Sequence, residues 1–289
     1  MKTLIIGNGL VASSLIQRLE AEGHELLIYS RTESKDKSYN QIVGDIFDYD
    51  SFSKALLWNP QIIIHTAWIT TPGLYRNDVS NFKYKDFTIE LARLAVESEV
   101  EHLIVLGTCA EYGRQSAAST AGITEVSPNS LYAEQKVAAF NSVEELVQNS
   151  ELRFTWARVF YPYGPFQDHK RLIPYLIESL KHRKSIQLAD TTSIYDWTTT
   201  RDIASAILWT IRNEVPAEID IGTSHGFTNL ELLSLLEEML GTRNFLTGDA
   251  RHEIGLGEVS VAGKNSPLFL SGWSPDDTLR SGLEWVLNS

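Results

Sequence analysis

The chain has 289 residues, of which 43% are hydrophobic and 21% charged, a composition typical of a soluble globular protein. Its formal net charge of -12 argues against nucleic acid or an anionic membrane as the main partner, because the average field of the protein repels both. A single cysteine, Cys109, leaves no internal disulfide, and Met1 leads directly into an apolar run with no cleavable signal before it. We therefore expect a cytoplasmic protein.

Short apolar runs alternate with amphipathic stretches of helical periodicity through the first half of the chain. The runs predicted as buried strands are residues 4–6, 26–29, 41–43, 62–65, 103–106 and 154–159. The helices predicted between them include residues 11–22, 78–99 and 131–148. This alternation predicts an α/β fold with a doubly wound parallel sheet of the Rossmann type.

The alternating pattern loosens after Arg158. Helices are predicted at residues 172–182, 201–213 and 230–240, with only short strand candidates among them. We expect a smaller mixed α/β lobe that covers the carboxyl ends of the strands. The predicted division is a dinucleotide-binding domain at 1–165 and a substrate-binding lobe mainly at 166–289, with the segment near 198–220 returning to the first domain.

A glycine-rich turn follows the first predicted strand and opens the first predicted helix. Gly7 permits a tight turn, Gly9 lets the main chain approach a phosphate, and Ala12 allows close helix-to-strand packing. The unpaired amides at the start of the helix, at Leu10 and Val11, favour an anion. The pattern predicts a pyrophosphate site; the alternative is a structural turn with accidental glycines.

The second predicted strand ends in Ser30 and Arg31, where an Asp or Glu normally holds the ribose 2′-hydroxyl of NAD. A guanidinium can bind a 2′-phosphate with charge-assisted hydrogen bonds, which favours NADP(H) over NAD(H). The alternative is an arginine in a solvated polar loop. After the third strand, Asp45 can accept a hydrogen bond from the adenine amine, although a simple loop aspartate is the alternative. Ile46, the next residue, is also predicted to belong to the cofactor site.

A tyrosine and a lysine stand four residues apart, so Tyr132 and Lys136 share one helix face. An ammonium beside a phenol favours phenolate, so this spacing predicts a lowered pKa for Tyr132 and proton exchange near neutral pH. Thr108, just past the fifth strand, can hydrogen-bond a substrate oxygen, or it can cap a turn. Cys109 is more typical of a small buried hydrophobe than of a nucleophile, although its place next to Thr108 can expose it to the pocket.

The whole chain resembles the extended short-chain dehydrogenase/reductase family, and within it the nucleotide-sugar epimerases, dehydratases and reductases. The motifs that carry the resemblance are the glycine turn from Gly7, Gly44-Asp45, the run Ile64 to Ala67, Gly107-Thr108 with Tyr112-Gly113, the Tyr132/Lys136 pair, the run Arg158 to Pro165, the run Asp196 to Ala204, and Ser271 to Pro275 with Gly282-Leu283. Each motif is modest, but their order and spacing together are specific.

The resemblance implies hydride transfer between a nicotinamide and a sugar carbon, with Tyr132 as acid or base, Lys136 on the nicotinamide ribose and Thr108 orienting the reacting oxygen. It adds Thr66, Ala67 and Arg158 to the cofactor site. It also implies a nucleoside diphosphate sugar lying across the smaller lobe. The substrate contacts that follow are Thr70, Thr71, Thr108, Cys109, Tyr161, Lys170, Arg171 and Trp197.

Two further points qualify these implications. For Lys170 and Arg171, a solvated helix start is the alternative to a substrate contact. The family also suggests a homodimer formed through the helices at 78–99 and 131–148.

Several positions depart from the family pattern. Cys109 and Ala110 stand where the 4,6-dehydratases carry the Asp-Glu pair that eliminates water, which argues against dehydration. Tyr161 replaces the usual Asn, and residues 193–196 lack the Arg that binds the diphosphate. In the helix after the fourth strand, Tyr84 falls at the position of an expected Asn, with Asn81 nearby.

Among the activities that the resemblance implies, Ser30 and Arg31 favour net reduction with NADPH. We therefore expect reduction of the keto group of a nucleotide-linked 4-keto-6-deoxy sugar, in deoxysugar biosynthesis. The alternatives are a nucleotide-sugar epimerase and a reductase of a ketone that carries no nucleotide. A non-catalytic regulator needs the glycine turn but not Tyr132 and Lys136, so the intact pair argues against it. The spacing of the histidines and the single cysteine predict no metal site.

Overall fold

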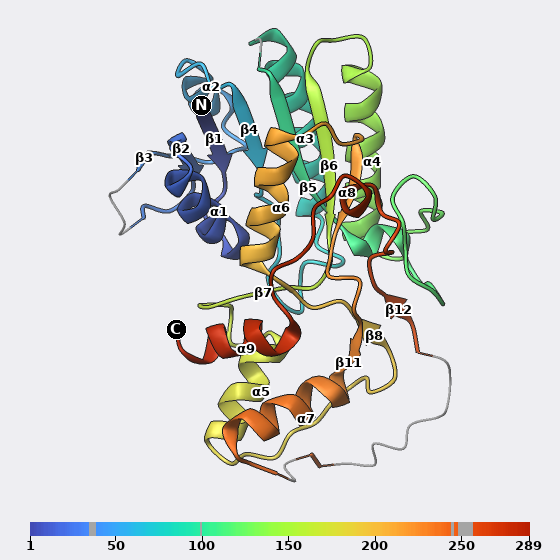
Figure 1. The fold of residues 1–289 in the computed structure, drawn as a ribbon. Helices are drawn as coiled ribbons and strands as arrows, with labels where there is room; N and C mark the ends of the chain where they lie inside the picture. The colour runs from blue at the N-terminus through green and yellow to red at the C-terminus, as the bar shows by residue number, and fades with distance from the viewer. Residues whose placement is uncertain (35–38, 99, 244–245, 248–256) are drawn as a thin grey trace.

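A seven-stranded sheet forms the centre of the molecule (Figure 1). The structure is a computed structural model that describes residues 1–34, 39–98, 100–243, 246–247 and 257–289. The strands, all parallel to their neighbours, are β1 (Lys2–Ile6), β2 (Glu25–Ser30), β3 (Asn40–Val43), β4 (Ile62–His65), β5 (His102–Thr108), β6 (Arg153–Val159) and β10 (Glu218–Ile221). Their order, β10-β6-β5-β4-β1-β2-β3, reverses direction at β1, as in a doubly wound Rossmann-type sheet.

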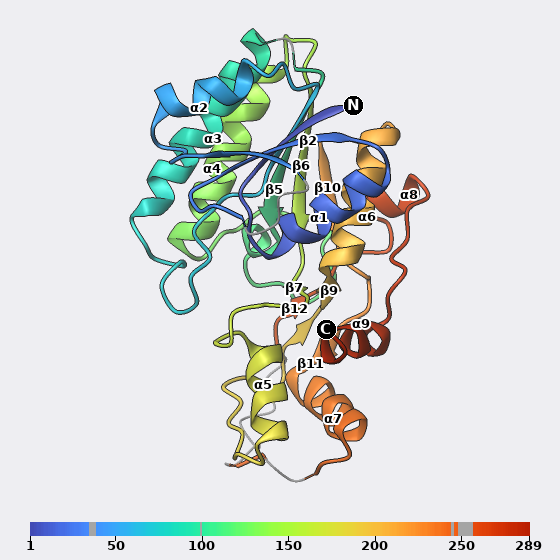
Figure 2. The same cartoon turned by 90° about the vertical axis from the view of Figure 1, so that its left-hand side faces the viewer.

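Helices cover both faces of this sheet, as Figure 2 shows. On one face lie α1 (Leu10–Ala21), α6 (Thr200–Arg212) and the short α8 (Pro267–Leu270), and on the other α2 (Tyr49–Leu56), α3 (Ser80–Glu97) and α4 (Leu131–Val147). Successive strand residues point to opposite faces, so in β1 Leu4 and Ile6 enter the core under α3 and α4, while Ile5 enters the core under α1 and α6. The double burial explains why the strands are continuous apolar runs.

A smaller lobe follows the carboxyl ends of the strands and has its own apolar core (Figure 1). Its elements are β7 (Pro162–Tyr163), α5 (Leu172–Lys181), β8 (Ile194–Tyr195), β9 (Thr198–Thr199), β11 (Phe227–Thr228), α7 (Asn229–Leu240), β12 (Val259–Ser260) and α9 (Leu279–Leu287). The 3-10 turn η1 (Cys109–Tyr112) follows β5 directly in the large domain. Strands β11, β8 and β12 form one small sheet, and β7 and β9 form another. No helix within the described ranges combines the length and apolar character needed to cross a membrane.

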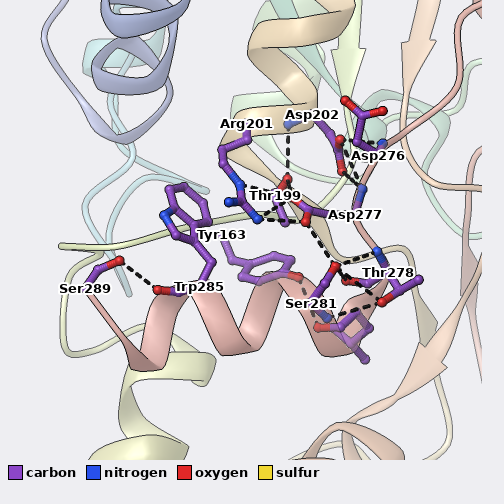
Figure 3. A network of polar contacts seen from close by, with 11 residues as sticks. Tyr163, Thr199, Arg201, Asp202, Asp276, Asp277, Thr278, Ser281, Trp285 and Ser289 are labelled. Atoms are coloured by element: carbon purple, nitrogen blue, oxygen red, sulfur yellow. Dashed lines mark hydrogen bonds and ion pairs between the residues drawn. The ribbon is translucent and has the colours of Figure 1, made fainter.

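Polar contacts at the start of α6 fasten the C-terminal helix α9 (Figure 3). The Arg201 guanidinium pairs with Asp277 at 2.7 Å and lies 4.2 Å from the centroid of the Trp285 ring. The buried carboxylate of Asp202 accepts the backbone N–H of Asp276 at 2.8 Å. The last helix is thereby joined to the large sheet layer.

The predicted fold class is confirmed, and each predicted strand and helix is present with ends that differ by a residue or two. For the helix predicted at 78–99, residue 99 lies outside the described residues. Helix α2, strand β10 and helix α9 are not among the predicted elements. In β10 the acidic residues Glu218 and Asp220 interrupt the apolar pattern, and their partners lie far away in the sequence. A dimer through α3 and α4 stays a prediction.

Candidate active site

The turn after β1 is shaped for close approach of main chain to main chain. Gly7 has a φ of +103°, which favours glycine, and its amide donates to the Tyr29 carbonyl at 2.8 Å. A Cβ at Gly7 would lie 2.6 Å from the Thr66 hydroxyl oxygen and 3.1 Å from the Ala67 nitrogen. The Thr66 hydroxyl donates to the Ile6 carbonyl at 2.9 Å. The loops after β1 and β4, both predicted to bind the cofactor, are thus in contact.

Gly9 leaves room above the start of α1. Its φ of -77° suits any residue, and a Cβ there would meet nothing within 4 Å, so nothing in the described chain requires glycine at this position. Among the described residues, no side chain caps the first backbone N–H groups of α1, which include those of Leu10 and Val11. Open space beside uncapped amides at a helix N-terminus fits a pyrophosphate, so these residues fit a dinucleotide.

Ser30 and Arg31 differ in their surroundings. The buried Ser30 hydroxyl donates to the Thr32 carbonyl at 2.9 Å and accepts from Gln41 Nε2 at 2.7 Å, so it shapes the loop. Arg31 is exposed, and it forms no ion pair or hydrogen bond with any residue in the described ranges. Asn8 Nδ2 donates to the Thr32 hydroxyl at 3.0 Å, which holds this loop beside the glycine turn. Arg31 is therefore a free cation next to the predicted cofactor site.

The two cofactor-site residues predicted after β3 have different environments. Asp45 is exposed, and its Oδ1 accepts the Phe47 amide at 3.0 Å, as in a loop aspartate. Ile46 is buried in the core beside Phe52. The Ile46 side chain is therefore part of the core, and its contact with a cofactor stays a prediction.

Tyr132 and Lys136 lie on the buried side of α4. The Tyr132 ring makes edge contacts with Tyr75, at 5.0 Å between centroids, and with Trp68, at 6.4 Å. Lys136 Nζ donates to the Leu106 carbonyl at 2.5 Å and lies 3.9 Å from the centroid of the Trp68 ring. The structure therefore places the pair on one buried face of α4, as the spacing predicts, with Lys136 against the Leu106 carbonyl of β5.

The pKa predicted for Tyr132 is wrong for this structure. Burial raises the pKa of the phenol, and a side-chain hydrogen bond with Thr108 opposes the rise. Burial also lowers the pKa of Lys136 to about 7, opposed by the charge of Glu111. The Lys136 ammonium does not lower the pKa of Tyr132, because its Nζ instead contacts the Leu106 carbonyl and the ring of Trp68. Tyr132 is therefore a protonated phenol at neutral pH.

Thr108, a candidate catalytic residue, is the N-cap of η1. Its hydroxyl accepts the Ala110 amide at 3.3 Å, so the turn-capping alternative describes its place in the protein as well. Its neighbour Cys109 is 8% exposed, and burial raises the pKa of the thiol to about 11. A buried, protonated thiol fits the small-hydrophobe interpretation of Cys109.

Two of the predicted substrate contacts meet across the lobes. Arg171, the N-cap of α5, donates to the Thr70 carbonyl in the loop after β4 at 2.5 Å. Its guanidinium also lies 5.5 Å from the ring centroid of Tyr75, which packs on Tyr132. Thr71 and Lys170 are exposed on either side of this bridge. This contact brings the small lobe next to Tyr75 and Tyr132.

Tyr161 and Tyr195, which both stand where the family pattern has other residues, are in contact. The Tyr161 ring lies 4.6 Å from Tyr195, in the segment that lacks the expected Arg, and 5.4 Å from Trp197. Tyr161 also packs against Cys109, next to the catalytic candidate Thr108. This side of the site is therefore lined by half-buried aromatic rings in place of an arginine and an asparagine.

Arg158, predicted as a cofactor contact, lies in the interior with 1% exposure. Its Nε donates to Glu111 at 2.7 Å and its Nη1 to Glu218 at 2.5 Å. These two carboxylates hold the guanidinium at the junction of η1, β6 and β10. A role for Arg158 in cofactor binding stays a prediction.

Sequence reasoning missed three residues that support the site, namely Trp68, Tyr75 and Glu111. Trp68 covers the Lys136 ammonium, and its Nε1 donates to Asn81 Oδ1 at 2.7 Å. Asn81 in turn donates to the Tyr75 carbonyl at 2.7 Å, while Tyr84, at the expected Asn position, stacks on Trp68.

The third missed residue is the buried Glu111, which accepts the Thr108 amide at 2.8 Å. The signal for it was the Thr-x-x-Glu spacing of a capping box. For Trp68 we find no such signal in the sequence.

Comparisons with known proteins identify the family of the chain. A family model described as the NAD dependent epimerase/dehydratase family matches residues 3–222. A UDP-glucose 4-epimerase from Lactobacillus helveticus is 23% identical over 99% of this chain and 97% of its own, and a GDP-L-colitose synthase from Yersinia pseudotuberculosis is 22% identical over 98% and 96%. Among solved structures, the UDP-glucose 4-epimerase of Thermus thermophilus in complex with NAD has a TM-score of 0.87 at 22% identity, covering 100% of this chain and 98% of that one. The family match spans the glycine turn, Thr108 and the Tyr132/Lys136 pair, and the chain belongs to the NAD-dependent epimerase/dehydratase family.

Proposed function

We propose that the protein uses NADPH to reduce the keto group of a nucleotide-linked 4-keto-6-deoxy sugar. The observation that carries the proposal is Arg31, an exposed and unpaired cation at the carboxyl end of β2, within the part of the chain that the structure describes. A guanidinium there suits a 2′-phosphate. An epimerase retains its nicotinamide through oxidation and re-reduction, whereas a reductase consumes reduced cofactor, which cells supply mainly as NADPH.

In the proposed reaction, Tyr132, Thr108 and Lys136 each have one role. The nicotinamide supplies the hydride when bound. Tyr132, kept protonated by its burial, donates its proton to the carbonyl oxygen as that oxygen gains charge. Thr108 donates a hydrogen bond to the same oxygen. Lys136 would bind the nicotinamide ribose. Dehydration has no acid-base pair, because Cys109 is a buried thiol and Ala110 has no ionisable group.

The substrate assignment rests on the small lobe and on the relatives. Arg171 and Lys170 supply positive charge beside Thr70, which suits a diphosphate. The half-buried rings of Tyr161 and Trp197 suit the less polar face of a deoxy sugar. The names of the UDP-glucose 4-epimerase and the GDP-L-colitose synthase both refer to nucleotide-linked sugars.

The test is a panel of nucleotide-linked 4-keto-6-deoxy sugars incubated with NADPH or NADH. We expect loss of nicotinamide absorbance with at least one sugar, faster with NADPH, and a reduced sugar as the product. If no sugar of the panel oxidises either cofactor, the proposal is wrong.

Two observations each favour another candidate, which the same panel separates. The similarity to a UDP-glucose 4-epimerase favours epimerisation, which would give a new sugar with no net change in nicotinamide absorbance. Tyr195, in the segment that lacks the expected Arg, favours a ketone without a nucleotide, which would be reduced as readily as its nucleotide-linked form. A matched pair of ketones with and without the nucleoside diphosphate decides between these outcomes.

A further inference from the structure

Glu111 is a fully buried carboxylate directly beneath the catalytic threonine. Its side chain accepts the Thr108 amide at 2.8 Å, Trp156 Nε1 at 3.0 Å and Arg158 Nε at 2.7 Å. A Cβ on Gly107 would lie 2.8 Å from Glu111 Oε1, so that glycine is needed for the carboxylate to fit. Contacts from β5 and β6 therefore converge on this one side chain of η1.

These contacts hold Glu111 in its ionised form. All three partners are donors, so a protonated carboxyl would find no acceptor for its own proton among them. Burial raises the pKa of Glu111, and the guanidinium of Arg158 together with the Thr108 amide opposes that rise. Arg158 is shared with Glu218 at 2.5 Å, and the arginine is always charged. A negative charge is thus fixed in the interior next to the catalytic residues.

The Lys136 ammonium faces this charge across an aromatic ring. Its Nζ lies 5.6 Å from the centroid of the Trp156 ring, whose Nε1 binds Glu111. The other groups around the ammonium are the Leu106 carbonyl on β5 and the Trp68 ring, and neither carries a formal charge.

Two titratable side chains also lie near the ammonium: the lysine charge acts on His65, and Tyr132 packs on the Trp68 ring that Lys136 contacts. His65 on β4 is neutral, because burial and the lysine charge lower its pKa to about 3, and Tyr132 on α4 is a protonated phenol. Among the described groups that affect the pKa of Lys136, Glu111 is the negative charge that favours the ammonium.

We propose that Glu111 is a positioning residue with two tasks: it fixes the main chain of Thr108, and its charge keeps Lys136 in the ammonium form that binds the nicotinamide ribose. This inference rests on the roles proposed above for Thr108 and Lys136. It adds that a buried charge at Glu111, rather than Tyr132, sets the protonation of the lysine. An acidic side chain that touches neither substrate nor cofactor then controls the upper pH limit of the reaction.

The substrate-free test compares Glu111→Gln with Glu218→Gln. Each variant removes one carboxylate from Arg158, but only the first removes the charge behind Trp156. The protein is labelled with ¹³C at the lysine Cε, the Lys136 signal is assigned by its absence in Lys136→Met, and its titration is followed by NMR. We expect a lower midpoint for Lys136 in Glu111→Gln and an unchanged midpoint in Glu218→Gln. Equal midpoints in the wild type and Glu111→Gln would overturn the proposal.

Because Glu111→Gln leaves Arg158 with one partner, a double variant guards against misfolding. Glu111→Gln with Arg158→Met removes both buried charges together, and the Lys136 midpoint is again expected below that of the wild type. This readout needs no sugar, so it stands even if the 4-keto sugar assignment fails. A double variant with the wild-type midpoint contradicts the charge effect.

The kinetic test uses the pH dependence of turnover. Loss of the ammonium makes Glu111→Gln about tenfold slower than the wild type at about pH 8, with a smaller deficit at about pH 6, because one pKa unit is a factor of ten in protonation. A purely structural role for Glu111 predicts the same deficit at both pH values. That result would limit Glu111 to holding the Thr108 main chain and would refute the proposal.

Discussion

Tyr132 is held between the rings of Tyr75 and Trp68, and the burial that raises the pKa of its phenol also keeps the proton in place. Tyr132→Phe retains the ring and removes that proton. We expect turnover to fall by about a thousandfold or more, with the cofactor bound as tightly as in the wild type. Tyr84→Phe, which removes another phenol from the same aromatic cluster, is the control and should keep turnover within about threefold. Full activity in Tyr132→Phe would exclude the tyrosine as proton donor.

Arg31 governs the choice of cofactor in the proposed function. Arg31→Ala removes the guanidinium expected to bind the 2′-phosphate, so the KM for NADPH should rise about tenfold to a hundredfold while that for NADH stays the same. Steady-state kinetics with each cofactor measure the ratio. Arg18→Ala, which removes an exposed arginine of α1 that lies 4.0 Å from Glu22, controls for the loss of surface charge. An equal rise for both cofactors would place Arg31 away from the 2′ position.

At the scale of the elements, patterns local in sequence were predicted and long-range pairings were not. The continuous apolar runs of β1 and β4 follow from burial on both faces of the sheet, and the face shared by Tyr132 and Lys136 follows from the 3.6-residue period of a helix. Strand β10 was not predicted, because its acidic residues Glu218 and Asp220 interrupt the apolar pattern. Their partners, Arg158 and Tyr112, come near them only in the folded chain. For the same reason the lysine-phenol spacing did not reveal that Trp68 takes up the Lys136 ammonium.

The attachment of α9 to α6 is testable at this scale. Arg201 pairs with Asp277, which is 10% exposed, and lies over the Trp285 ring, so Arg201→Ala should lower the free energy of unfolding by about 1–2 kcal/mol. Arg280 on α9 pairs with Glu238, which is 67% exposed, so Arg280→Ala should cost less than about 0.5 kcal/mol. Urea unfolding gives both values. Equal costs would show that the α6 contact adds nothing beyond a surface ion pair.

For the molecule as a whole, buried acids and buried histidines oppose one another as the pH falls. Burial raises the pKa of Asp202 and of Asp220 to about 6, so the folded state takes up these protons first, and stability rises as the pH falls from about 6 towards 3.8. Burial lowers the pKa of His65 and of His102 to about 3, so stability is lost as the pH falls from 6.5 towards 3. With two groups of each kind, the four contributions nearly cancel between about pH 6 and pH 4.

Single substitutions of a histidine and of an acid should change the pH dependence of the free energy of unfolding in opposite directions. His102→Gln removes one histidine that stays neutral in the folded protein. As the pH falls from about 6 to about 4, the free energy of unfolding of this variant should therefore rise by on the order of 2 kcal/mol relative to that of the wild type. Asp220→Asn removes one acid that binds a proton on folding, so it should lose a similar amount over the same window. Urea unfolding at a series of pH values measures both differences, and the slope with pH separates this effect from any constant loss of packing around Thr155 or Tyr112. Slopes of the same sign in the two variants would mean that burial does not set these pKa values.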